Sequence, residues 1–452
     1  MPRLFGTDGV RGKANSELTP ELAYKLGRAA TIYFGREAKL TELKSTPTVL
    51  IGRDTRVSGE MLEASLIAGI CSAGGRAIAA GIIPTPAVAY LAKKLETRAG
   101  IVISASHNPF YDNGIKFFGG DGYKLPDAVE DEIEAIVHKI EENDDFPRPT
   151  DDKLCHVENR HNLLEDYINF VLQTTDQRLD GMKIVLDCAN GAAYEAMPEI
   201  LQRLGAEVIA FGTNPNGINI NDNCGSTHID NLCQAVIDNK ADIGIAHDGD
   251  ADRCLCVDDE GHIIDGDHIL VICATEMMKA NKLPHNTVVT TVMANIGFRQ
   301  AIQKLGGKFE VTKVGDRYVL ENMLKNGYTL GGEQSGHIIF TEHSTTGDGL
   351  ITALQVLSAI KRTGKKASDL NKLMTTYPQV LLNVRVKDRT VYEKEEIQEA
   401  IKKAETELGD NGRILVRASG TEPLIRVMAE GPDQEQLEGI CRNIVSLIEN
   451  IQ

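Results

Sequence analysis

Residues 48–54 read Thr48-Val-Leu-Ile-Gly-Arg-Asp54, an apolar run of strand length. A helical pattern from Leu62 to Cys71 follows, and then a second apolar run, Gly74-Gly-Arg-Ala-Ile-Ala79. Apolar runs that alternate with helices are typical of parallel strands covered on both faces. The same unit occurs twice more, from Lys183-Ile-Val-Leu-Asp187 to Gly205-Ala-Glu-Val-Ile-Ala210 and from Thr287-Val-Val-Thr-Thr-Val-Met293 to Gly306-Gly-Lys-Phe-Glu-Val311. We therefore predict three related mixed α/β domains.

The remaining pattern places the domain boundaries. Thr19 and Pro20 have the residue types of a helix N-cap and first turn, and predict an opening helix that packs on the first sheet. After about residue 370 the pattern changes to short alternating strands and two amphipathic helices, which predicts a smaller C-terminal α+β domain. The expected domains are residues 1–157, 158–258, 259–370 and 371–452.

Composition excludes several classes of protein. The 452 residues are 42% hydrophobic and 25% charged, as in ordinary globular proteins. A net charge of −17 argues against nucleic-acid and anionic-membrane partners, which need a basic surface. The sequence lacks the apolar core of a signal peptide and any long apolar run, so we expect a cytoplasmic protein.

The cysteines give no sign of a zinc site. Nine of them are scattered without a CxxC pair, which predicts buried free thiols. The closest two, Cys254 and Cys256, are expected on opposite faces of a strand.

A metal site is indicated by Asp248-Gly-Asp-Ala-Asp-Arg253, which follows the apolar run Ala241-Asp-Ile-Gly-Ile-Ala246. In an extended segment, alternate residues project to one side, so three carboxylates could converge on one cation. Oxygen ligands favour Mg²⁺. An EF-hand fits poorly, because Arg253 stands where that loop needs glycine and Asp259 where it needs glutamate. A solvated acidic turn is the alternative, and the position after a buried strand favours the metal site.

A nucleophile is indicated by Ser104-Ala-Ser-His-Asn-Pro109, which ends the apolar run that begins at Ala99. The Ser106 hydroxyl would need a cation and a group that handles protons, and His107 and Lys116 are close in sequence. Ser104 is a competing nucleophile. A plain turn with a surface histidine is the alternative, and Asn108-Pro109 and Asp112-Asn-Gly114 also favour turns.

Two further loops are suited to a sugar phosphate. In Gly331-Gly-Glu-Gln-Ser-Gly-His337, glycines allow close approach, and Glu333 and Ser335 offer hydrogen-bonding groups for sugar hydroxyls. In Arg417-Ala-Ser-Gly-Thr-Glu-Pro423, followed by Arg426, guanidinium, hydroxyl and backbone N–H groups could bind an oxyanion. An ordinary turn and a surface ion pair are the respective alternatives.

These four loops resemble, in chain order, the signature loops of the α-D-phosphohexomutase superfamily, and the resemblance covers essentially the whole chain. Four more segments resemble most the bacterial members that act on glucosamine phosphate. They are Phe5-Gly-Thr-Asp-Gly-Val-Arg-Gly12, Asp187-Cys-Ala-Asn-Gly191, Cys224-Gly-Ser-Thr-His228 and Gly331-Gly-Glu-Gln-Ser-Gly-His-Ile-Ile339.

The resemblance implies four domains around a central cleft and a set of residue roles. Ser106 would carry a phosphoryl group, and Asp248, Asp250 and Asp252 would hold Mg²⁺ together with an oxygen on Ser106. Proton handling and charge stabilisation would fall to Lys116, His107 and Arg11, in that order. A loop matching Thr312-Lys-Val-Gly-Asp-Arg317 would lie near the sugar. The substrate contacts would be Arg253, Glu333, Ser335, Arg417, Ser419, Gly420, Thr421 and Arg426.

The implied reaction interconverts glucosamine 6-phosphate and glucosamine 1-phosphate through a phosphoserine and a 1,6-bisphosphate, and supplies UDP-N-acetylglucosamine synthesis. A sugar 1,6-bisphosphate is the expected activator, and the resemblance suggests a homodimer. The alternatives are a glucose or mannose phosphomutase, a metal-dependent phosphatase that passes through phosphoserine, and a catalytically silent sugar-phosphate-binding protein.

Overall fold

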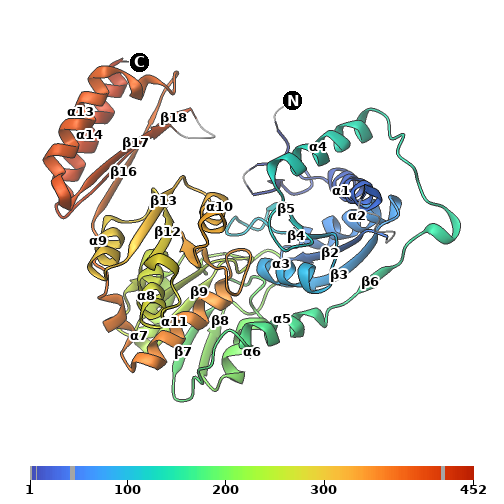
Figure 1. Ribbon diagram of the computed structural model, residues 1–452, viewed down its shortest axis with the longest axis horizontal. Coiled ribbons are helices and arrows are strands. Elements are labelled where there is room, and N and C mark those ends of the chain that lie inside the picture. The colour runs from blue at the N-terminus through green and yellow to red at the C-terminus, as the bar shows by residue number, and fades with distance from the viewer. Residues whose placement is uncertain (1–2, 7, 41–45, 419–422, 452) are drawn as a thin grey trace. The chain divides into compact units, whose positions relative to one another are not determined.

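The computed structural model describes residues 3–6, 8–40, 46–418 and 423–451 (Figure 1). The chain divides into two compact units. The first comprises Met1–Val292 and Glu310–Asn371, and the second comprises Met293–Phe309 and Lys372–Gln452.

The first sheet has six strands in the order β1-β5-β4-β2-β3-β6. Strands β2, β3, β4 and β6 are parallel, whereas β5 is antiparallel to β4 and β1 is antiparallel to β5. The strands are β1 (Val10–Lys13), β2 (Thr48–Arg53), β3 (Arg76–Ile82), β4 (Ala99–Ile103), β5 (Asp112–Gly119) and β6 (Val157–Asn159). The helices are α1 (Pro20–Leu40), α2 (Ser58–Ser72), α3 (Thr85–Lys94) and α4 (Asp127–Glu142), with the 3₁₀ turn η1 (Asp151–Lys153).

Helices cover both faces of this sheet, as predicted (Figure 1). Residues of α1, α2 and α4 share one buried apolar cluster with alternate residues of the strands. Helix α3 packs on the other face, where Val88 lies so close to Gly52 and Gly100 that a Cβ on either glycine would overlap it, at 2.6 and 2.8 Å. Thr19 caps α1 as expected, since its hydroxyl accepts a hydrogen bond from the Leu22 N–H at 3.2 Å.

The predicted turn at Asp112-Asn-Gly114 is wrong, because these residues begin β5. The Asn113 side chain is buried and bonded on both sides: it accepts from the Gly114 N–H at 2.8 Å and donates to the Ser58 hydroxyl at 2.8 Å. Gly114 faces the Ser104 carbonyl oxygen, which would lie 2.5 Å from a Cβ. The turn-forming residue types therefore serve a close backbone approach inside the sheet.

The second sheet has the order β11-β10-β9-β7-β8, with β7, β8 and β9 parallel and β10 and β11 antiparallel. The strands are β7 (Lys183–Asp187), β8 (Glu207–Phe211), β9 (Ile243–His247), β10 (Cys254–Asp258) and β11 (Ile263–Ile264). The helices of this region are α5 (Leu163–Leu172), α6 (Ala196–Arg203) and α7 (Asp230–Asn239).

The prediction for the cysteines is half right. All nine are free thiols, and six of them are buried. Cys254 and Cys256 lie on the same face of β10, with their sulfurs 3.9 Å apart, because residues two apart in a strand project to one side.

The third sheet has the order β13-β12-β14-β15, and β15 is antiparallel to β14. The strands are β12 (Thr287–Thr291), β13 (Lys308–Thr312), β14 (Leu330–Gly332) and β15 (Ile338–Phe340). The helices are α8 (Gly266–Lys279), η2 (Pro284–Asn286), α9 (Ile296–Lys304), α10 (Asp316–Asn326), α11 (Gly349–Thr363) and α12 (Ala367–Asn371). All three sheets are thus mixed: each has parallel strands, β12 and β14 in the third sheet, and antiparallel strands at an edge.

The second unit contains α9 and an antiparallel sheet in the order β16-β18-β17. Its apolar cluster joins this sheet to two amphipathic helices, as predicted. The elements are β16 (Gln379–Arg385), η3 (Val391–Glu393), α13 (Glu395–Leu408), η4 (Gly409–Asn411), β17 (Arg413–Ala418), β18 (Leu424–Glu430) and α14 (Gln434–Ile451). None of the helices in the described part of the chain has the length and apolar character that a membrane span requires.

Replacing Gly52 by valine should lower the melting temperature, because the new side chain would overlap Val88 and Ile83. Overpacking of this kind costs about 1–3 kcal/mol. Gly439→Ala in α14 is the control, since nothing lies within 4 Å of its added Cβ and alanine favours a helix. Differential scanning calorimetry measures both, and an unchanged transition for Gly52→Val would contradict this packing.

Candidate active site

Ser106 is buried in a constrained loop three residues after β4. Its φ of 52° is in the left-handed region, which a serine rarely adopts. The loop is held through the Ser106 carbonyl oxygen, which accepts hydrogen bonds from Arg56 and Asn221, both at 2.9 Å. The chain therefore fixes the direction of the Ser106 hydroxyl.

Ser104 has a structural place in this loop. Its hydroxyl donates to the Asp54 carboxylate at 2.6 Å and accepts from the Ser106 N–H at 2.9 Å. A hydroxyl bound on both sides in a fully buried position is poorly placed to attack a substrate. The geometry therefore favours Ser106 over its competitor.

The three aspartates converge, but not for the reason given from sequence. They lie in a turn between the antiparallel strands β9 and β10, and Ala251 at the turn has a φ of 60°. Asp248, Asp250 and Asp252 are all buried, and each offers a carboxylate oxygen within 4.8 Å of the others. The Ser106 hydroxyl donates to Asp248 Oδ2 at 2.5 Å, so the predicted nucleophile lies beside the predicted metal ligands.

Only part of this negative charge is compensated by the protein. Lys116 Nζ lies 2.9 Å from Asp250 Oδ2, and the Thr85 hydroxyl donates to the same oxygen at 2.7 Å. Burial alone would raise the pKa of Asp250, but the Lys116 ammonium outweighs it and lowers this pKa. Burial and the neighbouring aspartates raise the pKa values of Asp248 and Asp252.

The cluster therefore suits a hard divalent cation. Asp250 Oδ1 and Asp252 Oδ1 are buried and have no hydrogen-bond partner among the described residues. These carboxylate oxygens, which lie close to the Ser106 hydroxyl, are of the kind that Mg²⁺ prefers as ligands.

The candidate proton-handling groups surround Ser106. His107 Nδ1 lies 3.4 Å from the Ser106 hydroxyl oxygen, and burial followed by the Arg253 and Arg11 guanidiniums lowers the pKa of His107 to about 4. Lys116 is buried between Asp250 and Asp8, and these carboxylates outweigh burial and raise its pKa. His107 is therefore neutral and Lys116 is cationic near neutral pH. Arg11 forms an ion pair with Asp8, which connects it to Lys116.

The predicted sugar loop joins β14 to β15. Glu333 Oε1 accepts from the Gly315 N–H at 3.0 Å, which ties this loop to the one that precedes α10. The Ser335 hydroxyl is buried without a hydrogen-bond partner in the described chain, as expected of a group that awaits a ligand. Arg253 Nε lies 4.0 Å from Asp252, beside the acidic cluster.

In the second unit, Arg417 and Arg426 face each other across the antiparallel pair β17 and β18. Burial and the charge of Arg426 lower the pKa of Arg417. Guanidinium groups bind oxyanions through strong, often paired hydrogen bonds. Both arginines are therefore suited to an oxyanion, whereas the predicted contacts Ser419, Gly420 and Thr421 lie outside the described residues.

The sequence reasoning overlooked several residues of this site. His337 is buried, with Nε2 3.6 Å from Asp316 Oδ2 and 3.9 Å from Asp252 Oδ2, although it ends the quoted sugar loop. Asp8 stands inside the quoted motif Phe5–Gly12, and a charged residue between two glycines is a signal that could have been used. Thr85 carries no such signal, because its contact depends on folding.

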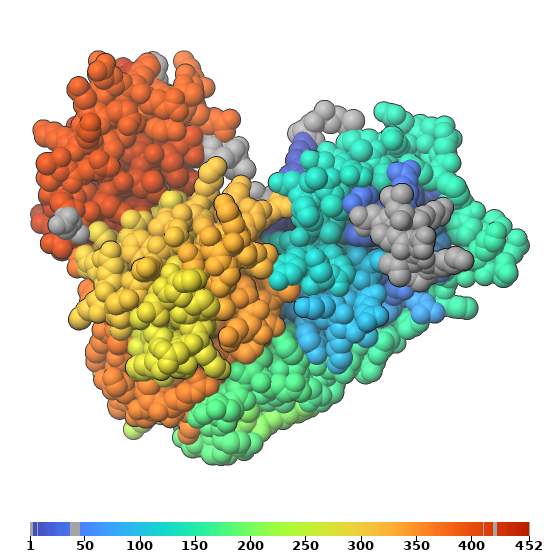
Figure 2. Space-filling view, viewed as in Figure 1, coloured from blue at the N-terminus to red at the C-terminus, as the bar shows by residue number. Residues whose placement is uncertain are grey.

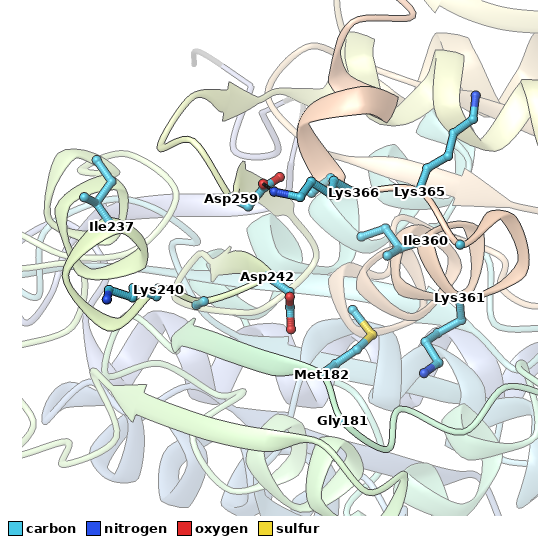
Figure 3. Close-up of a pocket in the computed structure, with 13 residues that line it drawn as sticks. Gly181, Met182, Ile237, Lys240, Asp242, Asp259, Ile360, Lys361, Lys365 and Lys366 are labelled. Carbon is cyan, nitrogen blue, oxygen red and sulfur yellow. Dashed lines mark hydrogen bonds and ion pairs between the residues drawn. The ribbon is translucent and has the colours of Figure 1, made fainter.

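A separate cavity of about 530 Å³ contains none of these residues (Figure 3). Met182, Ile360 and Asp242 line it, together with lysines. Lys366 pairs with Asp259, and the ammonium groups of Lys240 and Lys365 point in different directions (Figure 3). Lys240 and Lys365 therefore do not converge on one anion in this cavity.

Comparison with known proteins defines the class. Four models of phosphoglucomutase/phosphomannomutase match the chain: α/β/α domain I at residues 2–144, domain II at 165–261, domain III at 265–377 and the C-terminal domain at 381–447. The chain belongs to the phosphoglucomutase/phosphomannomutase family, whose members are phosphosugar mutases of the phosphohexomutase superfamily.

Full-length relatives belong to the same class, and solved structures share the fold. The phosphoglucosamine mutase of Pelotomaculum thermopropionicum is 53% identical over 452 residues and 100% of both chains, and that of Brevibacillus brevis is 51% identical over 449 residues and 99% of both. A phosphoglucomutase/phosphomannomutase family protein from Burkholderia thailandensis superposes with a TM-score of 0.80 at 23% identity, over 99% of this chain and 98% of that one. Aspergillus fumigatus N-acetylphosphoglucosamine mutase, solved with GlcNAc-6P and magnesium, gives a TM-score of 0.70 at 18% identity, over 99% and 96% of the two chains.

Removing a carboxylate from the acidic cluster should weaken divalent-cation binding. Asp252→Asn is expected to reduce affinity for Mn²⁺, used as a probe for Mg²⁺, by about tenfold or more, because even second-shell changes cost about 10–100-fold. Isothermal titration calorimetry measures the affinity, with Asp238→Asn on the exposed side of α7 as the control. Equal affinities for both variants would show that the cluster is not the cation site.

Proposed function

We propose that the chain interconverts glucosamine 6-phosphate and glucosamine 1-phosphate, with Ser106 as the phosphoryl carrier. One observation carries the proposal: the buried Ser106 hydroxyl lies 2.5 Å from Asp248 in a cluster of three aspartates. The phosphoglucosamine mutases that are about half identical over the full length support the choice of substrate.

The reaction consists of two phosphoryl transfers. Phosphoserine 106 gives its phosphoryl group to O1 of glucosamine 6-phosphate; the P–O bond to serine breaks, a P–O bond to the sugar forms, and the hydroxyl proton of the sugar leaves as the serine oxygen regains one. The 1,6-bisphosphate then turns around in the site. Its 6-phosphoryl group returns to Ser106 and glucosamine 1-phosphate leaves, so the phosphoserine is restored.

We propose Asp248, Asp250, Asp252 and an oxygen on Ser106 as ligands of Mg²⁺. When bound, this ion neutralises charge on the transferring group. The protein contributes the fixed direction of the Ser106 hydroxyl and the exclusion of water by burial.

Protons would be handled by Lys116 and His107. The ammonium of Lys116 can donate a proton and stabilise negative charge, whereas the neutral imidazole of His107 can accept a proton near the Ser106 oxygen. Arg11 would stabilise charge from its position on Asp8.

Substrate binding would be divided between two kinds of group. Glu333 and Ser335 would contact the sugar hydroxyls, with Arg253 beside the reacting group. Arg417 and Arg426 would bind the phosphate that does not react, because guanidinium groups form strong hydrogen bonds with phosphate oxygens. Ser419, Gly420 and Thr421 would complete that site.

The proposal also covers the activator, the domain boundaries, the cellular location and the oligomeric state. A sugar 1,6-bisphosphate would restore enzyme that has lost its phosphoryl group. The functional domains would be residues 1–157, 158–258, 259–370 and 371–452. We expect a cytoplasmic homodimer, and light scattering after size-exclusion chromatography would measure its mass.

Ser106→Ala should abolish isomerisation, because alanine cannot carry the phosphoryl group. The measurement is a coupled assay for glucosamine 1-phosphate with Mg²⁺ and a trace of glucose 1,6-bisphosphate. The chelator EDTA should stop the wild-type reaction, and excess Mg²⁺ should restore it. Full activity of Ser106→Ala would disprove the phosphoserine mechanism.

The same assay with glucose 6-phosphate and mannose 6-phosphate tests the substrate. The family models are described for phosphoglucomutase and phosphomannomutase, so these sugars are the closest alternatives. Turnover of only these two would retain the mechanism and reject glucosamine phosphate. Release of inorganic phosphate without isomerisation would identify a phosphatase.

Arg417→Gln should raise the KM for glucosamine 6-phosphate by about 10–100-fold, which corresponds to the loss of one charged hydrogen bond. Arg442→Gln in α14 is the control, because its side chain is 73% exposed. Steady-state kinetics would measure both. An unchanged KM for Arg417→Gln would remove this residue from the phosphate site.

A further inference from the structure

Lys124 joins two carboxylates that approach the active site from different directions. Its Nζ lies 2.7 Å from Asp8 Oδ1 and 2.6 Å from Asp316 Oδ2, and its side chain is 17% exposed. Lys124 follows β5, whereas Asp8 precedes β1 and Asp316 begins α10. The contact joins residues 116 and 192 positions apart, and the teal and orange surfaces adjoin in Figure 2.

On one side, this contact continues to the groups that handle charge. Asp8 contacts Lys124 through Oδ1, and its Oδ2 lies 2.9 Å from Lys116 Nζ. Asp8 also forms an ion pair with Arg11. Lys116 in turn binds Asp250. A shift of the Asp8 carboxylate would therefore move two of the candidate catalytic groups.

On the other side, the contact continues to the sugar loop. Gly315, the residue before Asp316, donates its N–H to Glu333 Oε1 at 3.0 Å. The next residue, Arg317, pairs with Asp127 and donates to the Leu125 carbonyl oxygen at 2.8 Å. Residues 124–127 thus hold residues 315–317 at two points.

The Lys124 ammonium is the cation that Asp8 and Asp316 share. The carboxylates of Asp8 and Asp316 outweigh burial and raise the pKa of Lys124, and the ammonium helps to lower the pKa of Asp316 to about 2. Without the ammonium, Asp8 would keep Lys116 and Arg11, but Asp316 would lose its lysine partner in a largely buried position, where an unpaired charge is costly.

We propose that Lys124 is a positioning residue for the mutase reaction: through Asp8 it sets Lys116 and Arg11, and through Asp316 it sets the Gly315 N–H that holds Glu333. The inference rests on the proposed function, since those groups act in that reaction. Lys124 touches none of the reacting atoms in this account, so its effect depends on the two carboxylates.

The test compares Lys124→Met, Lys124→Arg and the exposed control Lys93→Met in the full chain. Glucosamine 1-phosphate formation is measured well below each variant's melting temperature and per phosphorylated site, which is counted by intact mass. Lys124→Met is expected to lower kcat by about 10–100-fold, as displacement of a catalytic group by about 1 Å does. Lys124→Arg should restore most of that loss, because it keeps the charge.

The outcomes separate a positioning role from a merely structural one. If Lys124→Met lowers the melting temperature but keeps kcat within about twofold, less than misplacement of a catalytic group costs, the ion pair is structural and the inference is overturned while the mutase survives. If Lys124→Arg is as slow as Lys124→Met, charge is not what Lys124 supplies and the inference also fails. Wild-type protein that isomerises no hexose phosphate would overturn the proposed function, and the inference with it.

Discussion

Three carboxylates buried within 4.8 Å of one another are the constraint on which the site depends. Like charges at that distance repel strongly when they are buried away from water, so they stay ionised only with positive charge nearby. Lys116 compensates Asp250, whereas burial and the neighbouring aspartates raise the pKa values of Asp248 and Asp252. A bound divalent cation would complete the balance, and it would do so beside the Ser106 hydroxyl.

The fold brings this charge to the serine through close backbone packing. A Cβ on Gly249, inside the aspartate turn, would lie 2.5 Å from the Ser106 carbonyl oxygen. Asn221 donates to that same oxygen from the second sheet's region, and Arg56 does so from the loop after β2. The serine loop and the aspartate turn are therefore one packed body, and the strained φ of Ser106 is maintained by contacts from three segments.

The sequence predicted most of the architecture, because buried parallel strands and amphipathic helices have strong local patterns. It missed β1 and β5, since Asp112-Asn-Gly114 has the residue types of a turn and the contacts that place it in a strand come from Ser58 and Ser104. The site was predicted where residues lie close in sequence, as in the aspartate turn. Two contacts could not be predicted in this way: the one between Asp54 and Ser104, and the one that joins Lys124 to Asp8 and Asp316. They connect residues 50 to 192 positions apart, so no local sequence pattern indicates them.

The central claim is that Ser106 carries the phosphoryl group, and peptide mapping by mass spectrometry tests it most directly. The protein would be treated with phosphatase, incubated with glucose 1,6-bisphosphate and Mg²⁺, and digested. We predict one phosphoryl group, on Ser106, which appears with the bisphosphate; when the bisphosphate carries a radiolabel, the label should pass from Ser106 into glucosamine phosphate on addition of glucosamine 6-phosphate. A phosphoryl group on Ser104 or His107 instead, or none on the protein while isomerisation proceeds, would contradict the account.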